Sequence, residues 1–310
     1  MSLEITRIHV YKKLSTINIK DNNIVFFHGA TLDNRSKSVW EYFDTKTSNI
    51  CSLSYDEKNF LIELKFEDEV IRSQAFKFSQ ELKNFLDYDE FFIDATSLGF
   101  AELLILLYGL NLHKAKNIKI IYAEPEKYTI KKLDSVFNNE FDLTSEFKGF
   151  KKIPPFSLLI DSNSNSKAEL IVFLGFENDR LERIIENDDA AKYARYTPIL
   201  ALPAFVPGWE NISLMRHHQE ISMFEDLYFS PANNPFETNN ILMDISRNSN
   251  YENLVIAPIG TKPHAIGSMI FIINAKEKSK NIGIVYDFPS KKENRTDGIG
   301  NINVYSLSTC

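Results

Sequence analysis

Residues 254–267 read LVIAPIGTKPHAIG, a short apolar run followed by a loop and the start of an apolar helix. Leu254 to Ala257 has the aliphatic composition of a strand buried on both faces, and helical spacing begins near Ala265. The chain repeats this alternation of strand, loop and helix along most of its length, which is typical of a mostly parallel sheet covered on both faces. The sequence therefore predicts an α/β fold.

The other expected elements follow from the same patterns of apolar residues. The alternation within Leu3 to Lys20 predicts two strands joined by a turn, an N-terminal β-hairpin. Short apolar runs predict the buried strands, and apolar residues at helical spacing predict the helices. We expect strands at 24–27, 60–66, 91–93, 117–122, 170–174, 199–202 and 282–286, and helices at 35–43, 71–86, 99–112, 180–186, 211–224 and 265–275.

Two stretches of the chain match at a constant offset of 164 residues. Lys116–Tyr122 reads KNIKIIY and Lys280–Tyr286 reads KNIGIVY, and Pro125 and Pro289 follow at the same offset. Buried parallel strands all resemble one another in composition, so the aliphatic positions alone would match without common origin. The shared Lys-Asn, Tyr and Pro favour a duplication over that alternative. We therefore expect two tandem Rossmann-like units.

A polar, proline-containing stretch separates the two series of elements. Residues 151–167 contain Pro154-Pro155 and the run from Asp161 to Lys167, which have the composition of a loop. We expect residues 1–150 to form the first Rossmann-like unit together with the hairpin. Residues 151–167 are expected to be a linker, and residues 168–310 the second unit.

Composition and charge exclude several classes of function. The chain has 310 residues, 44% of them hydrophobic, which is ample for a buried core, and its net charge of −7 is unfavourable for binding duplex nucleic acid. No apolar run approaches the roughly 20 residues of a membrane span, and the first residues lack the pattern of a signal peptide. Two cysteines, Cys51 and Cys310, provide neither a disulfide framework nor zinc-ligand spacing. We expect a cytoplasmic protein with no membrane partner.

The familiar motifs of enzymes are missing from the sequence. It contains no GxxxxGK[ST] phosphate loop, no GxGxxG, no GxSxG and no HExxH. His217-His218 near Glu220 suggests metal ligands, but adjacent helical residues point about 100° apart. We expect no cofactor and no metal, and the sequence leaves open whether the protein is an enzyme.

The loop after the strand at 254–257 carries the strongest candidate site. Gly260 permits a tight turn, Thr261 offers a capping hydroxyl and Lys262 adds a positive charge at a helix start. His264 is suited to stacking on a base or to proton transfer. The alternative is a well-capped helix with a solvated lysine. We interpret the loop as an anion pocket, because it joins caps and a cation at the carboxyl end of a strand.

The loops after the other expected strands hold further candidates. Thr96 and Ser97 occupy the matching place in the first half, as ligand contacts or as helix caps. Gly175 permits close approach of a ligand to the backbone. Arg35 and Arg180 suit phosphate, unless they pair with acids such as Asp33 and Asp179.

Two candidates stand further from this pattern. Trp209 is suited to stacking on a nucleobase, or to packing as a lid or beneath a partner. Arg295 belongs to a charged stretch, 295–300, that we expect to be a flexible loop before a final strand at 303–307. Such a loop either closes over a pocket and brings Arg295 to a phosphate, or is a surface turn.

The loop Gly260-Thr261-Lys262-Pro263 between a strand and a helix resembles the Gly-Thr-Lys signature of CARF domains. CARF domains are Rossmann-like sensors of cyclic oligonucleotides in prokaryotic antiviral systems. Two such halves in one chain resemble the SAVED domain, with the likeness covering roughly residues 22–303. Thr96-Ser97 departs from the signature because no lysine accompanies it.

The resemblance implies a binding module that senses a nucleotide-type phosphorylated ligand, including cyclic oligonucleotides, between the two halves. It implies a role in antiviral defence, with the signal passed to a protein effector partner or through self-assembly. Two alternatives stay open. One is a metal-independent phosphodiesterase that degrades such a ligand, and the other is a protein-binding adaptor subunit of a defence complex.

Overall fold

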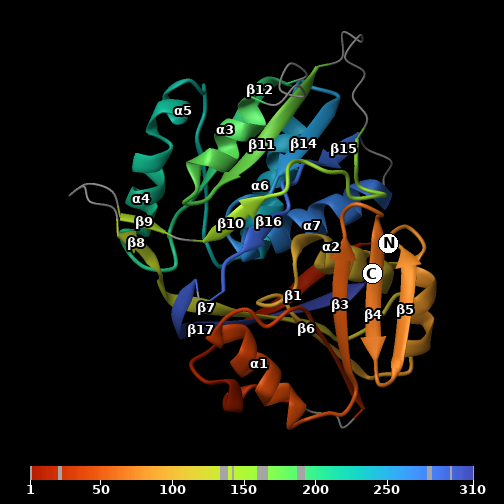
Figure 1. Ribbon diagram of the computed structural model, residues 1–310. Coiled ribbons are helices and arrows are strands. Elements are labelled where there is room, and N and C mark those ends of the chain that lie inside the picture. Colours follow the sequence, from red (N-terminus) through yellow and green to blue (C-terminus); the bar gives the residue numbers. More distant parts are fainter. Residues whose placement is uncertain are drawn as a thin grey trace. The chain divides into compact units, whose positions relative to one another are not determined.

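The computed structural model describes residues 2–19, 23–132, 139–141, 143–158, 167–186, 193–277, 281–293 and 295–309 (Figure 1). The chain divides into two compact units. Unit 1 comprises Met1–Lys148 and Pro289–Cys310, and unit 2 comprises Gly149–Phe288. The fold is mixed α/β with largely parallel sheets, which confirms the predicted α/β class.

The described residues of unit 1 form an eight-stranded sheet in the order β1-β17-β7-β6-β2-β3-β4-β5, with two short two-stranded sheets, β10-β16 and β8-β9. The run from β7 to β3 is parallel, and the outer strands join it antiparallel. The elements of unit 1 are β1 (Leu3–Tyr11), η1 (Leu14–Thr16), β2 (Ile24–His28), α1 (Asn34–Asp44), β3 (Ile50–Asp56), β4 (Leu61–Phe66), β5 (Glu69–Gln74), η2 (Phe78–Phe85), β6 (Glu90–Asp94), α2 (Phe100–Leu112), β7 (Ile118–Tyr128), β8 (Ile130–Lys132), β9 (Asn139–Phe141), β10 (Thr144–Phe147), β16 (Pro289–Lys291) and β17 (Thr296–Thr309).

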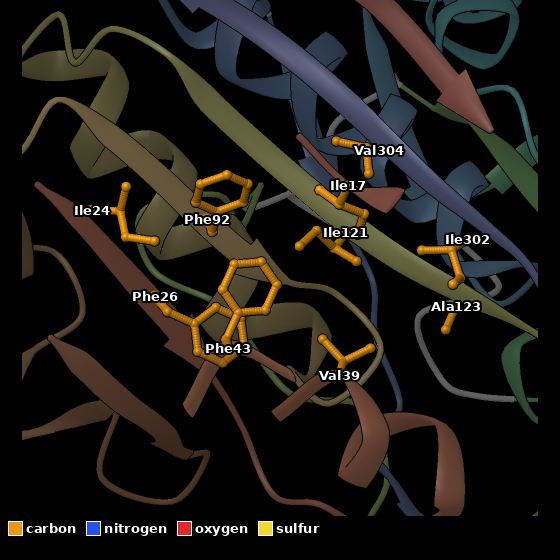
Figure 2. Packing of buried hydrophobic residues seen from close by; sticks show 10 residues of the cluster. All are labelled: Ile17, Ile24, Phe26, Val39, Phe43, Phe92, Ile121, Ala123, Ile302 and Val304. Carbon is orange, nitrogen blue, oxygen red and sulfur yellow. The ribbon is translucent and has the colours of Figure 1, made fainter. Parts of the chain in front are cut away.

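Both faces of the parallel strands in unit 1 are covered, because successive side chains of a strand point to opposite faces. Phe26 stacks on Phe43 of α1 with ring centroids 4.3 Å apart, as Figure 2 shows. Its neighbour Phe27 contacts Phe85 of η2 at 5.7 Å. Burial on both faces explains why these strands are continuous apolar runs rather than alternating ones.

The prediction of an N-terminal β-hairpin is wrong. Among residues 2–19, Leu3–Tyr11 forms one strand, and the chain then turns through the 3-10 helix Leu14–Thr16. The partner of β1 is β17 at the other end of the chain, with Leu3 opposite Thr309. A period-two pattern marks a strand but carries no information about which strand pairs with it.

The helix expected at 71–86 is also wrong. Glu69–Gln74 is strand β5, paired antiparallel with β4, and Phe78–Phe85 is a 3-10 helix. Phe78, Leu82 and Phe85 are buried. Their spacing marks the packed face of a helix, and a 3-10 helix also presents residues three apart on one face.

Unit 2 contains a five-stranded parallel sheet in the order β13-β12-β11-β14-β15 among its described residues. Leu170 and Val172 of β11 pack with Leu181 of α3 in one cluster. Phe173, on the other face, contacts His264 of α7 with ring centroids 5.0 Å apart. The elements of unit 2 are β11 (Ala168–Leu174), α3 (Asn178–Glu186), β12 (Tyr193–Ala201), α4 (Trp209–Arg216), α5 (His218–Ser222), β13 (Tyr228–Ser230), α6 (Pro235–Asn248), β14 (Asn253–Ala257), α7 (Lys262–Glu277) and β15 (Ile282–Ile284).

The two units share the order of their parallel strands. In unit 1 the order is β7-β6-β2-β3, and in unit 2 the corresponding order is β15-β14-β11-β12. In unit 1, β2 is followed by helix α1 and its neighbour β6 by helix α2. In unit 2, β11 is followed by helix α3 and its neighbour β14 by helix α7. The strands at 118–122 and 282–284 that carry the matched sequences occupy equivalent places in the two sheets.

The division of the chain differs from the expected boundaries at both ends of unit 2. Residues 289–310 belong to unit 1 instead of the second unit, because β17 pairs with β1 and β7. Residues 151–158 pack within unit 2 rather than linking, since Ile153 and Phe156 are buried and Lys151 bridges Tyr286. The rest of the expected linker, 159–166, lies outside the described residues, as do Lys280 and Cys310.

The prediction of a flexible loop at 295–300 is also wrong. Residue Thr296 already begins β17, opposite Tyr128 of β7, and Ile299 lies opposite Pro125. Gly298, with φ of +71°, is accommodated inside the strand. None of the described helices is both long enough and apolar enough to cross a membrane.

Candidate ligand-binding site

The carboxyl ends of β11 and β14 lie side by side in unit 2, where the two parallel strands pair. Gly175 follows β11 directly, and a Cβ atom placed on it would lie 2.8 Å from the carbonyl oxygen of Ile259. Only glycine permits this approach of the two backbones. The close contact holds the loop that contains Gly260 against the end of β11.

Thr261 caps α7 and ties the loop to the neighbouring chain. Its Oγ1 donates a hydrogen bond to the carbonyl oxygen of Ala232 at 2.7 Å and accepts one from the backbone N–H of His264 at 3.3 Å. The helix-cap alternative for Thr261 is therefore what its geometry shows. Gly260, Thr261 and Lys262 are nevertheless only half-buried, so this loop is within reach of solvent.

His264 is fully buried beneath the loop. Its Nε2 lies 3.2 Å from the carbonyl oxygen of Ser230 and 3.1 Å from that of Pro231, and because carbonyls only accept, Nε2 carries the proton. Nδ1 makes no hydrogen bond with any described residue. Burial lowers the pKa of His264 to about 4, against the weaker opposing effect of the two carbonyls. The neutral, enclosed imidazole supports the loop from within.

Arg180 forms a buried ion pair rather than an open phosphate contact. Its Nη2 and Nε donate to the carboxylate of Asp287 at 2.6 and 2.8 Å, and Nη1 donates to the carbonyl oxygen of Ile259 at 3.3 Å. Burial disfavours the charge, but Asp287 outweighs it and raises the pKa of Arg180. The alternative of pairing with an acid holds, and the acid is Asp287 instead of Asp179.

Trp209 begins α4 beside the same edge of the sheet. Its half-buried ring meets Phe176, the residue after Gly175, edge to face at 5.7 Å. Ser213 of the same helix donates to the carbonyl oxygen of Gly175 at 2.7 Å, and His217 Nε2 donates to it at 3.1 Å. These bonds dock α4 onto the end of β11.

The matching loop of unit 1 is closed by its own side chains. Ser97 Oγ donates to the carboxylate of Asp94 at 2.6 Å and accepts from the backbone N–H of Gly29 at 2.8 Å. Thr96 Oγ1 accepts from the backbone N–H of Ala123 at 3.0 Å. Thr96 and Ser97 are both buried, so their hydroxyls join strands β2, β6 and β7 instead of facing a ligand.

Arg35 is likewise buried in unit 1. Its guanidinium donates to Asp33 at 2.7 Å, to the carbonyl oxygen of Ala123 at 2.9 Å and to Thr296 Oγ1 at 3.0 Å. Burial alone would raise the pKa of Asp33, but the charge of Arg35 and the hydrogen bonds to its carboxylate lower it to about 2. The pairing of Arg35 with Asp33 is again the alternative that the sequence left open.

The candidates therefore fall into two groups. Arg295 lies in unit 1 just before β17, where its carbonyl oxygen accepts from the backbone N–H of Thr129 at 3.0 Å. Unit 1 thus holds Arg35, Thr96, Ser97 and Arg295, and the described carboxyl edge of unit 2 holds Gly175, Arg180, Trp209, Gly260, Thr261, Lys262 and His264.

Sequence reasoning missed two residues that build this edge. Asp287 follows the matched strand of unit 2, and an acid next to a strand end was the only signal that it would hold Arg180. His217 drew notice only as a metal ligand, yet it bonds Gly175. Among the described residues, no three His, Cys, Asp or Glu side chains gather closely enough to hold a metal ion.

No protein-family model matches the chain, and no curated protein matches it either.

Proposed function

We propose that the chain is a binding module that senses a small phosphorylated ligand at the loop Pro258–Lys262 of unit 2. The observation that carries this proposal is the half-exposed Gly260-Thr261-Lys262 sequence at the start of the sixteen-residue helix α7. The helix start supplies the positive end of a dipole, and Lys262 adds a full charge. Both favour phosphate.

The position of the loop in the sheet supports the same proposal. β11 and β14 are adjacent, but α3 packs on one face of the sheet and α7 on the other. A crevice forms where connections leave neighbouring strands toward opposite faces, and ligands of α/β sheets collect there. Gly175 and Gly260 lie on the two sides of this point.

The proposed ligand is of the nucleotide type, and a cyclic oligonucleotide is included. The resemblance of Gly260-Thr261-Lys262-Pro263 to the CARF signature supports this class. The shared strand order of the two units supports two Rossmann-like copies of one ancestor, as in the SAVED domain. On this proposal the protein acts in the cytoplasm in antiviral defence, and the bound ligand changes its assembly with an effector or with itself.

The buried geometry of unit 1 changes the proposed ligand set. Thr96, Ser97 and Arg35 have their polar atoms occupied within unit 1, and Arg180 is held by Asp287. The proposed contacts are therefore Gly260, Thr261 and Lys262. The phosphodiesterase alternative, which called on His264 or Lys262 at the reacting atoms, keeps only Lys262, because the ring of His264 is fully enclosed.

The adaptor alternative is favoured by one observation. Strand β13 is at the edge of its sheet. Four apolar side chains at or near this strand are at least one third exposed. A protein that recruits a partner gathers such residues at the contact. They are Leu202, Tyr228, Phe229 and Phe236.

A thermal-shift screen of mononucleotides, linear dinucleotides and cyclic oligonucleotides tests the proposal. A ligand present at a hundred times its Kd adds about 2.7 kcal/mol of stability, which is readily seen. Lys262→Ala should abolish the shift. Lys167→Ala is the matched control, since Lys167 is exposed and directly precedes β11. It therefore lies at the amino ends of the parallel strands, away from the loop at their carboxyl ends.

Chromatography of the same samples measures turnover of the ligand. A sensor leaves the ligand intact over hours, whereas breakdown of the ligand favours the phosphodiesterase. If no nucleotide shifts the wild-type protein, or if Lys262→Ala retains the full shift, the proposal is wrong.

A further inference from the structure

A pocket of about 570 Å³ lies wholly within unit 1. Its volume is in the range of sites that take small organic molecules, roughly 300–1,000 Å³. It is bordered by α1, by strands β2, β3 and β4 and by the loops that join β2, α1 and β3. None of the candidate residues for the phosphate loop contributes to its lining.

The floor of the pocket is a row of polar side chains across three paired strands. His28 lies opposite Ser52, and Ser52 lies opposite Lys65, so all three point to one face of the sheet. Ile50 lies on the same face two residues before Ser52. Beside this row, α1 packs on the central strands through Val39 and Phe43 (Figure 2).

His28 presents an acceptor rather than a charge. Its Nδ1 lies 2.8 Å from the carbonyl oxygen of Gly29, and since a carbonyl only accepts, Nδ1 carries the proton. Burial lowers the pKa of His28, against the opposing effects of Gly29 and Asp94. The ring is therefore neutral at pH 7 and leaves Nε2 as an acceptor.

The walls add acceptors and one flat surface. Asp44 at the end of α1 and Glu67 just after β4 bring two carboxylates, while the cation Lys65 is already paired with Glu63 at 3.1 Å. Trp40 of α1 lines the same space. The lining thus carries more negative than positive charge, together with an indole ring on which a flat molecule stacks.

We propose that this pocket binds a planar heterocycle that bears adjacent N–H donors and no negative charge, of which the guanine base of a nucleoside is the simplest natural form. The adjacent N1–H and 2-amino groups of guanine match the two oxygens of a carboxylate, Asp44 or Glu67. The ring stacks on Trp40. The site goes beyond the phosphate loop of unit 2, since it lies on other residues and selects against phosphate.

Isothermal titration calorimetry of the full chain with guanosine tests the site. Wild-type protein should bind guanosine, and the double variant Asp44→Asn with Glu67→Gln should bind it at least tenfold more weakly. Trp40→Leu should weaken it as well. Glu41→Gln is the matched control, because Glu41 is an exposed carboxylate of the same helix that faces Lys37 and does not line the pocket.

The ligand is varied in the same way. Inosine lacks the 2-amino group and should bind about tenfold more weakly, as expected for one lost hydrogen bond to a charged group. Guanosine 5′-monophosphate should also bind the Lys262→Ala variant, which lacks the proposed phosphate contact of unit 2, more weakly than guanosine does, because its phosphate meets the acidic lining.

Three results would overturn the proposal: no binding of guanosine to wild-type protein, unchanged affinity in the double variant, or tighter binding of the monophosphate than of the nucleoside to Lys262→Ala. Lys262→Ala should leave the affinity for guanosine unchanged. Failure of this site is thereby distinguished from failure of the phosphate loop.

Discussion

The carboxyl edges of the two sheets are built on one plan and completed differently. In each unit a glycine after the first strand, Gly29 or Gly175, touches the backbone of the loop after the neighbouring strand. In unit 1 that loop is closed, because the hydroxyls of Thr96 and Ser97 form hydrogen bonds with the backbone of the adjoining strands and their ends. In unit 2 the loop remains half-exposed and carries Lys262. Shared topology therefore does not make two equal loops, and of these two loops only that of unit 2 carries a lysine.

A buried arginine near the start of the first helix is common to both units. Arg35 pairs with Asp33 and Arg180 with Asp287, and each guanidinium also donates to a backbone carbonyl. The sequence left open whether both arginines contact phosphate or pair with nearby acids. Their burial in ion pairs indicates instead that they fasten the helix to the strand ends.

The largest expected effect comes from breaking these pairs. Arg180→Ala leaves Asp287, 1% exposed, without its partner, which should cost unit 2 about 3–5 kcal/mol. The chain has two tryptophans, Trp40 in unit 1 and Trp209 in unit 2. Urea unfolding in a Trp40→Phe background reports on unit 2, and in a Trp209→Phe background on unit 1.

The matched variant Arg35→Ala should destabilise unit 1 instead. Replacing both partners, Arg180→Met with Asp287→Leu, should cost much less than Arg180→Ala alone, because no buried charge is stranded. Equal stability of Arg180→Ala and wild type in the Trp209 signal would show that the pair does not hold the edge of unit 2.

The next largest effect is on the pH dependence of stability, which differs between the two units. His264 is protonated in the unfolded chain below pH 6.5 but in the folded state only below about 4, so the unfolded state binds more protons between these values. Stability at high pH is therefore lost as the pH falls, by about 3 kcal/mol across this window. His264→Gln should flatten the decline measured from pH 6.5 to 4 by urea unfolding.

His218→Gln is the control, because His218 is exposed. Asp33 in unit 1 acts in a lower window, since its folded pKa is depressed from 3.8 to about 2 and its contribution is lost only as the pH falls through that range. An unchanged pH dependence in His264→Gln would mean that the pKa of this ring is the same in the folded and unfolded protein.

A smaller effect tests the shared glycine contact. A Cβ on Gly175 would lie 2.8 Å from the Ile259 carbonyl oxygen, and one on Gly29 would lie 2.9 Å from the backbone of Leu98. Alanine at either position should destabilise its own unit by about 1–3 kcal/mol through overpacking. Gly300→Ala is the control, because its nearest neighbour would be 3.4 Å away. Two alanine variants as stable as this control would contradict the close approach.

Much of the fold could be predicted from local pattern. The apolar runs at 91–93, 170–174 and 254–257 are strands, and 35–43 and 99–112 are helices within a residue or two. The strands were predictable because burial on both faces of a sheet leaves a continuous apolar run.

Pairing over long distances could not be predicted. The partnership of β1 with β17 joins the two ends of the chain, and nothing local to Leu3–Tyr11 encodes it. The site was predictable only in part for the same reason. Gly260, Thr261 and Lys262 form a loop whose chemistry is local, whereas the pairing of Arg180 with Asp287 depends on two distant strand ends meeting.

Amide hydrogen exchange with and without the most stabilising cyclic oligonucleotide tests the central claim most directly. Binding at the phosphate loop should slow exchange in residues 258–266 of unit 2 and leave residues 94–99 of unit 1 unchanged. Saturating ligand that protects 94–99 instead, or protects neither segment, would contradict the claim that unit 2 alone keeps an open site at this edge.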